Sequence, residues 1–221
     1  MPEERESEQK YVNKNSQPNN FVNLQETIPT LLIDLAYATK HNFVGEKIDG
    51  YESNIALLTR EATTALAKVQ KELTNEGLGL KVLDAYRPQR SVDQFLAWAK
   101  NMEDTKTKQE FYPNLTKQEL FDQGYLFERS SHSRGSTIDV TLVDLQSGLE
   151  LDMGSAFDFF DSISWSDSKQ ISTQQNTNRL MLKQAMLKHG FLPIATEWWH
   201  FTLAKEPYPD IYFDFVAGVN S

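Results

Sequence analysis

The segment at residues 130–139, which reads SSHSRGSTID, constrains the fold more than any other part of the chain. A tight turn around a glycine leads into an alternation of aliphatic and polar side chains, which is typical of a strand with one face on the core. Ile138 and Val140 take the aliphatic face, and Asp139 lies on the opposite one. His132 precedes Asp139 by seven positions. The segment therefore predicts an imidazole and a carboxylate on either side of one turn.

A second histidine, His200, closes the tetrapeptide Glu-Trp-Trp-His at residues 197–200. The chain has no cysteine, so any metal must be bound by His, Asp or Glu. Two imidazoles and one carboxylate form an open three-ligand zinc site, which leaves a position for water. Glu197 would then act as the general base on that water. His132, Asp139, His200 and Glu197 together predict a zinc hydrolase with one zinc ion per chain.

These residues also have ordinary structural explanations. A histidine and an aspartate at this spacing are commonly unrelated polar side chains of a loop and a strand. Glu197 and His200 would share one face of a helix but not of a flat strand, and the aromatic Trp198 and Trp199 favour a strand. We therefore expect Glu197 in a bend before the strand that carries His200, with a purely structural carboxylate as the alternative.

Arg87 ends a predicted strand and precedes a proline. A guanidinium at that place would stabilise an anionic tetrahedral intermediate, although for Arg87 taken alone a surface arginine is the simpler explanation. The two remaining histidines are His41, in a predicted loop, and His189, at a predicted helix C-terminus where a cation is favourable. We assign both to structural or solvent-exposed roles and neither to the metal.

Helical and strand periodicities follow one another along the chain, and the last strands have short connections. This order predicts an α+β fold, a single domain with a central, mostly antiparallel sheet flanked by helices. The polar residues 1–22 are expected to form a flexible tail, and residues 23–221 the domain. Strands are predicted at 30–37, 80–86, 137–142 and around His200, helices at 53–76, 91–100, 116–124 and 176–189, and a mobile surface loop at 161–175.

The formal charge of −9 argues against nucleic acid or an anionic membrane as a partner. No apolar run reaches about 18 residues, so no membrane insertion is expected. The N-terminus lacks the apolar core of a secretory leader. A cytoplasmic location is the expectation, with the periplasm as the alternative if a leader has been removed. The oligomeric state is left open.

An ordered series of short motifs resembles the D-alanyl-D-alanine dipeptidases of the vancomycin-resistance (VanX) type, a family of zinc metallopeptidases. The resemblance covers roughly residues 30 to 216, and the order of the motifs is more specific than any one of them. The matching segments are Tyr37-Ala38-Thr39, Asp49-Gly50-Tyr51-Glu52, Tyr86-Arg87-Pro88, Ser130-Ser131-His132-Ser133-Arg134-Gly135-Ser136, Ile138-Asp139, Met153-Gly154-Ser155, Phe157-Asp158-Phe159, Glu197-Trp198-Trp199-His200 and Glu206-Pro207-Tyr208-Pro209.

The resemblance implies a hedgehog/D-Ala-D-Ala peptidase-like fold and hydrolysis of the dipeptide D-alanyl-D-alanine, in cell-wall peptide metabolism or vancomycin-type resistance. It also implies a role for each matching residue. His132, Asp139 and His200 would bind zinc, Glu197 would be the general base and then the proton donor to the leaving amine, and Arg87 would stabilise the transition state. Ser130, Asp158 and Tyr37 would line the substrate pocket, with Asp158 pairing with the dipeptide ammonium.

Two other functions stay open. One is a D,D-carboxypeptidase or endopeptidase acting on longer peptidoglycan peptides, with the same metal ligands and a different pocket. The other is a non-catalytic, zinc-stabilised binding module, against which the presence of Glu197 and Arg87 counts. The chain departs from the family pattern in its polar N-terminal extension and at Thr137, where the family often has alanine. Thr137 is expected on the Asp139 side of the strand, where it would change the surroundings of a ligand.

Overall fold

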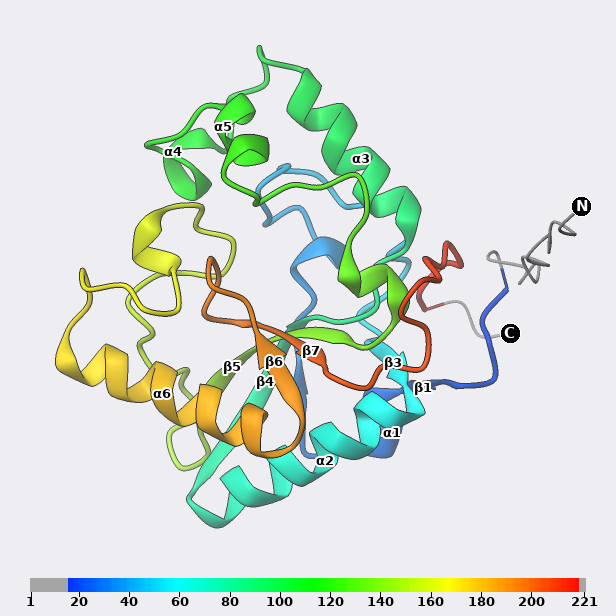
Figure 1. The fold of residues 1–221 in the computed structure, drawn as a ribbon, viewed down its shortest axis with the longest axis vertical. Coiled ribbons are helices and arrows are strands. Elements are labelled where there is room, and N and C mark those ends of the chain that lie inside the picture. The colour runs from blue at the N-terminus through cyan, green and yellow to red at the C-terminus, as the bar shows by residue number, and fades with distance from the viewer. Residues whose placement is uncertain (1–15, 219–221) are drawn as a thin grey trace, which may run out of the picture.

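A five-stranded mixed sheet forms the centre of the computed structural model, which describes residues 16–218 (Figure 1). The strand order is β2-β4-β5-β7-β6, with β2 parallel to β4 and every other neighbouring pair antiparallel. The predicted α+β domain with a mostly antiparallel sheet is therefore confirmed. The strands are β2 (Leu32–Ile33), β4 (Leu78–Asp84), β5 (Thr137–Asp144), β6 (Phe191–Pro193) and β7 (His200–Leu203).

Helices flank this sheet on two sides (Figure 1). The long helices α2 (Arg60–Asn75) and α6 (Thr173–Lys188) pack against each other and against the strands. Helix α3 (Gln89–Lys100) and the short helices α4 (Lys108–Phe111) and α5 (Lys117–Asp122) lie on the other side. The shorter helical segments are α1 (Leu24–Thr27), α4 (Lys108–Phe111), α5 (Lys117–Asp122) and the 3-10 turns η1 (Ala36–Ala38), η2 (Ser131–Arg134) and η3 (Ser162–Ser164).

Strand β5 is buried along both faces, which is what places a polar site inside the molecule. Its aliphatic residues Ile138 and Val140 join the main hydrophobic core. The polar side chains of Thr137, Asp139 and Thr141 alternate with them, and each is at most 2% exposed. Asp139 therefore points away from the aliphatic core, as the alternation predicts, but toward a covered surface rather than toward solvent.

Two predicted elements are shorter than expected. The strand predicted at 30–37 is reduced to Leu32–Ile33, and its last residues turn into η1. The helix predicted at 53–76 begins only at Arg60, because the Thr59 side chain accepts a hydrogen bond from the Ala62 amide and caps it. The residues just before the helix form strand β3 (Leu57–Thr59). The other predicted helices and strands lie within a few residues of their observed positions.

The N-terminal boundary of the folded part lies earlier than residue 23. Most of the predicted tail, residues 1–15, lies outside the described residues. Within the remainder, strand β1 (Phe21–Asn23) pairs antiparallel with β3. Phe21 is 4% exposed and packs against Tyr86, Phe213 and Phe215 in a second hydrophobic cluster. The burial of Phe21 and the pairing of β1 with β3 together offset the ordering of the few polar neighbours.

The segment predicted as a surface loop at 161–175 contains ordered and buried structure. It includes η3, whose Ser164 is fully buried, and the start of α6, where Ser172 and Gln175 form a capping box. Arg179 of α6 donates hydrogen bonds to the Met153, Ile163 and Trp165 carbonyls, which ties this segment to the helix. No helix within residues 16–218 is long and apolar enough to cross a membrane.

Candidate metal centre

The turn between His132 and Asp139 is built by η2 and the glycine that ends it. Gly135 has φ +81° and occupies the left-handed region that favours glycine. A Cβ at this position would lie 2.2 Å from two ring atoms of Phe21, so the close approach also requires glycine. β5 starts two residues later, and its pairing with β7 sets Asp139 opposite His200. Local turn geometry and sheet register thus bring the three residues together.

The three predicted ligands form one buried cluster. His132 Nε2 lies 3.3 Å from Asp139 Oδ2, and His200 Nδ1 lies 3.1 Å from Asp139 Oδ1. The two imidazole nitrogens are 3.2 Å apart. One donor atom from each residue lies within 4.8 Å of the others, and all three side chains are buried. This is the one cluster of its kind found among residues 16–218.

The far nitrogen of each imidazole is engaged outside the cluster, which leaves the near one facing the carboxylate. His132 Nδ1 lies 2.7 Å from the Ala85 carbonyl oxygen, so this nitrogen carries a proton and Nε2 is free to bind a metal. His200 uses the opposite pair of atoms: Nε2 lies 3.4 Å from Ser131 Oγ, and Nδ1 faces the cluster. Such outer hydrogen bonds orient metal-binding histidines.

The Asp139 carboxylate is the feature of this cluster that most favours a bound cation. Its Oδ1 is buried and accepts no hydrogen bond that meets geometric criteria within the described part of the chain. Burial by itself raises the pKa of this carboxyl, but the neighbouring His132 and His200 imidazoles outweigh it and hold the pKa below its ordinary value. A buried, ionised carboxylate beside two inward-facing nitrogens has the donor set of a metal site.

Glu197 lies beside this cluster, in the bend between β6 and β7 where it was predicted. Its Oε2 is 3.6 Å from His200 Nδ1. Burial raises the pKa of Glu197 to about 8, with the carboxylates Asp139 and Asp158 adding to the shift. A carboxyl that titrates near neutral pH is suited both to accept and to return a proton.

Arg87 is largely covered, with 13% of its side chain exposed, so the alternative of a surface arginine is wrong for this residue. Its Nε and one terminal nitrogen contact Asp84 Oδ2 at 2.9 and 2.8 Å, and its guanidinium lies 4.9 Å from the centre of the Tyr37 ring. Asp84 was not predicted. It is fully buried, accepts a hydrogen bond of 2.6 Å from the Tyr51 hydroxyl and lies 3.5 Å from His132 Nδ1. The available signal in the sequence was an acidic residue at the end of a mostly apolar strand.

A cavity of about 230 Å³ opens onto these groups. Glu197, Arg87 and the three clustered residues line it, as do the predicted pocket residues Tyr37, Ser130 and Asp158. Its volume is below the roughly 300–1,000 Å³ usual for sites that take drug-sized ligands. The site therefore suits a small substrate.

Asp158 and Tyr37 form one wall of the cavity. The Tyr37 hydroxyl donates a hydrogen bond of 2.7 Å to Asp158 Oδ2. Burial raises the pKa of Asp158 to about 8, although the bond from Tyr37 and the charge of Arg87 act against the shift. Asp158 has φ +57°, the single positive value at a non-glycine among the described residues. A strained backbone that is kept at a site wall is commonly functional.

The remaining predicted side chains have local roles. The Ser130 hydroxyl oxygen accepts a hydrogen bond from the His132 amide and caps η2 while it lines the cavity. Thr137 Oγ1 lies 2.9 Å from Thr202 Oγ1 across the β5–β7 pair, so it links two strands and leaves the Asp139 carboxylate alone. His41 and His189 contact Glu110 and Glu72, away from the cluster, as expected of structural or exposed histidines.

Comparison with known proteins places this chain in a family. Residues 17–218 match the family model described as D-ala-D-ala dipeptidase. A D-alanyl-D-alanine dipeptidase of Enterococcus faecalis is 44% identical over 200 residues, 90% of this chain and 99% of that protein. One of Streptomyces coelicolor is 43% identical over 195 residues, 88% of this chain and 96% of that protein.

Likeness among solved structures is lower. The LD-carboxypeptidase LdcB aligns with a TM-score of 0.46 and 18% identity, over 88% of this chain and 72% of that one, and adds nothing to the assignment. The family match over residues 17–218 and the identity to relatives matched over nearly their whole length are sufficient to assign the family. The chain belongs to the D-Ala-D-Ala dipeptidase family and is a metallopeptidase.

Proposed function

We propose that this protein hydrolyses the dipeptide D-alanyl-D-alanine with one zinc ion per chain, bound by His132, Asp139 and His200. The observation that carries the proposal is the juxtaposition of three convergent donor atoms, the largely covered Glu197 and a small cavity lined by Asp158. The names of the curated relatives support the substrate. The spacing supports the metal, since a tetrahedral ion with bonds of about 2.0–2.1 Å holds its ligand atoms about 3.3 Å apart.

Each residue at the cavity has a chemical task in this proposal. A bound zinc ion supplies a Lewis acid that polarises the peptide carbonyl and lowers the pKa of water. The Glu197 carboxylate accepts the proton of the attacking water and returns it to the amine of the leaving D-alanine. The Arg87 guanidinium faces the cavity and stabilises the negative charge that develops on the carbonyl oxygen.

The amino end of the substrate is proposed to lie against the cavity wall formed by Asp158 and Tyr37. An ammonium group placed at Asp158 would form an ion pair with its carboxylate and keep it ionised, because a nearby positive charge lowers the pKa of a carboxyl. Tyr37 holds that carboxylate in place through its hydrogen bond, and Ser130 completes the lining. A free amine is therefore part of recognition, which favours a dipeptidase over a carboxypeptidase acting on longer peptides. The product, free D-alanine, suits cell-wall peptide metabolism or vancomycin-type resistance.

The test is turnover of D-Ala-D-Ala by the zinc-loaded protein and by Glu197→Gln. This variant keeps the side-chain size and the three proposed ligands, so zinc content should stay at one per chain while kcat falls by about 10²–10⁴-fold. Glu103→Gln, at an exposed glutamate distant in sequence from the site, is the matched control and should keep the parent rate. Parent-like turnover by Glu197→Gln would remove the role assigned to Glu197.

A further inference from the structure

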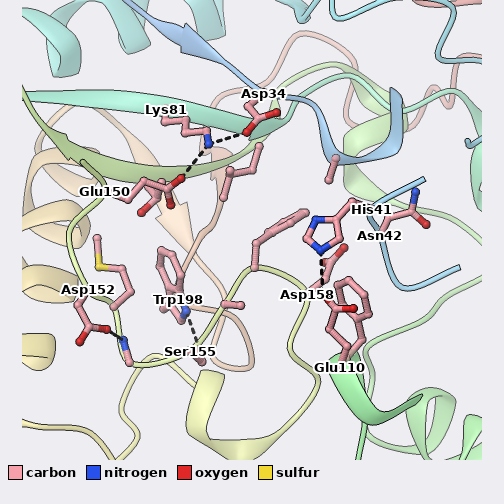
Figure 2. A pocket seen from close by; sticks show the side chains of 18 of the residues that line it. Asp34, His41, Asn42, Lys81, Glu110, Glu150, Asp152, Ser155, Asp158 and Trp198 are labelled. Atoms are coloured by element: carbon pink, nitrogen blue, oxygen red, sulfur yellow. Dashed lines mark hydrogen bonds and ion pairs between the residues drawn. The ribbon is translucent and has the colours of Figure 1, made fainter. Parts of the chain in front are cut away.

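A second and larger cavity, of about 720 Å³, shares a lining residue with the first. Figure 2 shows this second cavity from close by. Asp139 lines the first cavity, and Thr141, two residues further along the same strand face, lines the second. Figure 2 shows Lys81 with Asp34 and Glu150 in one part of its wall and His41 with Glu110 in another. Nothing in the proposed hydrolysis of a dipeptide uses this space.

The linings of the two cavities have a single residue in common. Asp158 lines both, and it is the one residue that their walls share. The hydrogen bond from Tyr37 holds its carboxylate, and Phe157 beside it packs against Tyr37 and Trp199. Its left-handed backbone, uncommon for a residue other than glycine, indicates that the surrounding structure holds Asp158 in place.

The second cavity also contains a hydrogen-bonding group without a partner. Thr141 is 1% exposed, and its Oγ1 has no hydrogen-bond partner within residues 16–218. The charged side chains around it are largely paired with one another: Lys81 contacts both Asp34 and Glu150. A buried hydroxyl left unpaired at a cavity wall costs free energy unless a ligand or water bonds to it. Because Oγ1 is almost wholly covered, the Thr141 side chain must rotate before its hydroxyl can donate to a peptide carbonyl or accept from a peptide amide.

We propose that this second cavity is a latent subsite for the amino-terminal part of a longer peptide, closed off by the Tyr37–Asp158 wall. The inference rests on the proposed function, in which the substrate ammonium lies at Asp158. A residue joined to that nitrogen would have to extend through the position of the Asp158 side chain. Asp139 and Thr141 are separated by about 6.6 Å along β5, which two peptide residues span at about 3.3–3.6 Å each.

The experiment compares two substitutions that differ in volume at the wall. Asp158→Asn removes the charge and keeps the wall closed. Asp158→Gly removes both the charge and the side chain, and glycine adopts φ +57° without strain, so the fold should be kept. Each zinc-loaded variant is assayed on D-Ala-D-Ala and on L-Ala-D-Ala-D-Ala, with release of the terminal D-alanine as the readout. The ratio of kcat/KM for the tripeptide to kcat/KM for the dipeptide should be at least about tenfold higher in Asp158→Gly than in Asp158→Asn.

A blocking substitution tests whether the gained activity uses this cavity. Ala156 is exposed and lines the second cavity but not the first. Ala156→Trp in the Asp158→Gly background should abolish the gain on the tripeptide, while Ala156→Trp alone should leave dipeptide turnover unchanged. Calorimetric binding of the tripeptide to Asp158→Gly combined with Glu197→Gln gives a readout independent of turnover, and Ala156→Trp should weaken it.

The outcomes separate the two proposals. If the parent fails to hydrolyse D-Ala-D-Ala, the proposed function is wrong. If the parent hydrolyses it and Asp158→Gly and Asp158→Asn show the same substrate ratio, the latent subsite is wrong and the dipeptidase stands. A gain in Asp158→Gly that Ala156→Trp does not reduce would also overturn the inference, because the extension would then lie elsewhere.

Discussion

Replacing Gly135 by alanine should destabilise the protein through two separate effects. At φ +81° an L-residue costs about 1–2 kcal/mol relative to the right-handed region. The new Cβ would also lie 2.2 Å from the Phe21 ring, where ordinary contacts are longer than 3.4 Å. That ring must move by more than an ångström within a packed aromatic cluster, and overpacking of this kind costs about 1–3 kcal/mol. The expected total is about 2–5 kcal/mol, a large share of a typical stability of roughly 5–15 kcal/mol.

Urea unfolding followed by circular dichroism measures this change as a shift in midpoint at constant slope. Gly148→Ala is the matched control, since Gly148 also has a positive φ, +73°, but has no atom within 4 Å of the new Cβ. It should show only the backbone cost. In the double variant with Phe21→Ala, itself worth about 3–5 kcal/mol, the clash disappears. The combined loss should therefore fall short of the sum by about 1–3 kcal/mol.

Two results would refute this reasoning. Equal midpoints for Gly135→Ala and Gly148→Ala would mean that the Phe21 contact has no energetic consequence. Additive losses in the double variant would mean that the two positions do not interact. Because Gly135 ends the turn that carries His132, Gly135→Ala should also weaken zinc binding, measured by competition with a chromophoric chelator, whereas Gly148→Ala should not.

Two further predictions concern charge at the site. In metal-free protein, burial raises the pKa of Asp158 to about 8, so the stability contributed by its protonated form is fully present below about pH 4 and is lost as the pH rises to about 8. Between these pH values the unfolding free energy of Asp158→Asn should fall less steeply than that of the parent, by about 1.4 kcal/mol per pH unit. Parallel curves of unfolding free energy against pH for the two proteins would contradict this pKa. Free zinc at 100 times its dissociation constant should raise the unfolding free energy of the parent by about 2.7 kcal/mol in the same assay. His132→Ala should lose this stabilisation, and His41→Ala, at an exposed histidine, should keep it. A zinc response of His132→Ala equal to that of the parent would exclude His132 as a ligand.

Much of the site was predictable because its residues are rare in composition and regular in local pattern. With no cysteine and four histidines, a metal site had few ways to form. The alternation through β5 put Asp139 opposite the aliphatic face, and the aromatic pair before His200 favoured a bend followed by a strand. The errors fall where local pattern gives no signal. An apolar segment before α2 continues the helical periodicity, yet Thr59 caps the helix and the preceding residues pair with β1.

The sequence by itself determined which chemical groups this protein has available: two imidazoles, a carboxylate on the polar face of a strand, and a glutamate in the bend before the strand that carries His200. Only the tertiary structure decided how they meet, because the β5–β7 register sets Asp139 opposite His200 and the Ala85 carbonyl orients His132. It also revealed Asp84 beneath Arg87, and the shared wall at Asp158 between two cavities. Contacts of this kind join residues distant along the chain, so they depend on packing and pairing that periodicity does not specify.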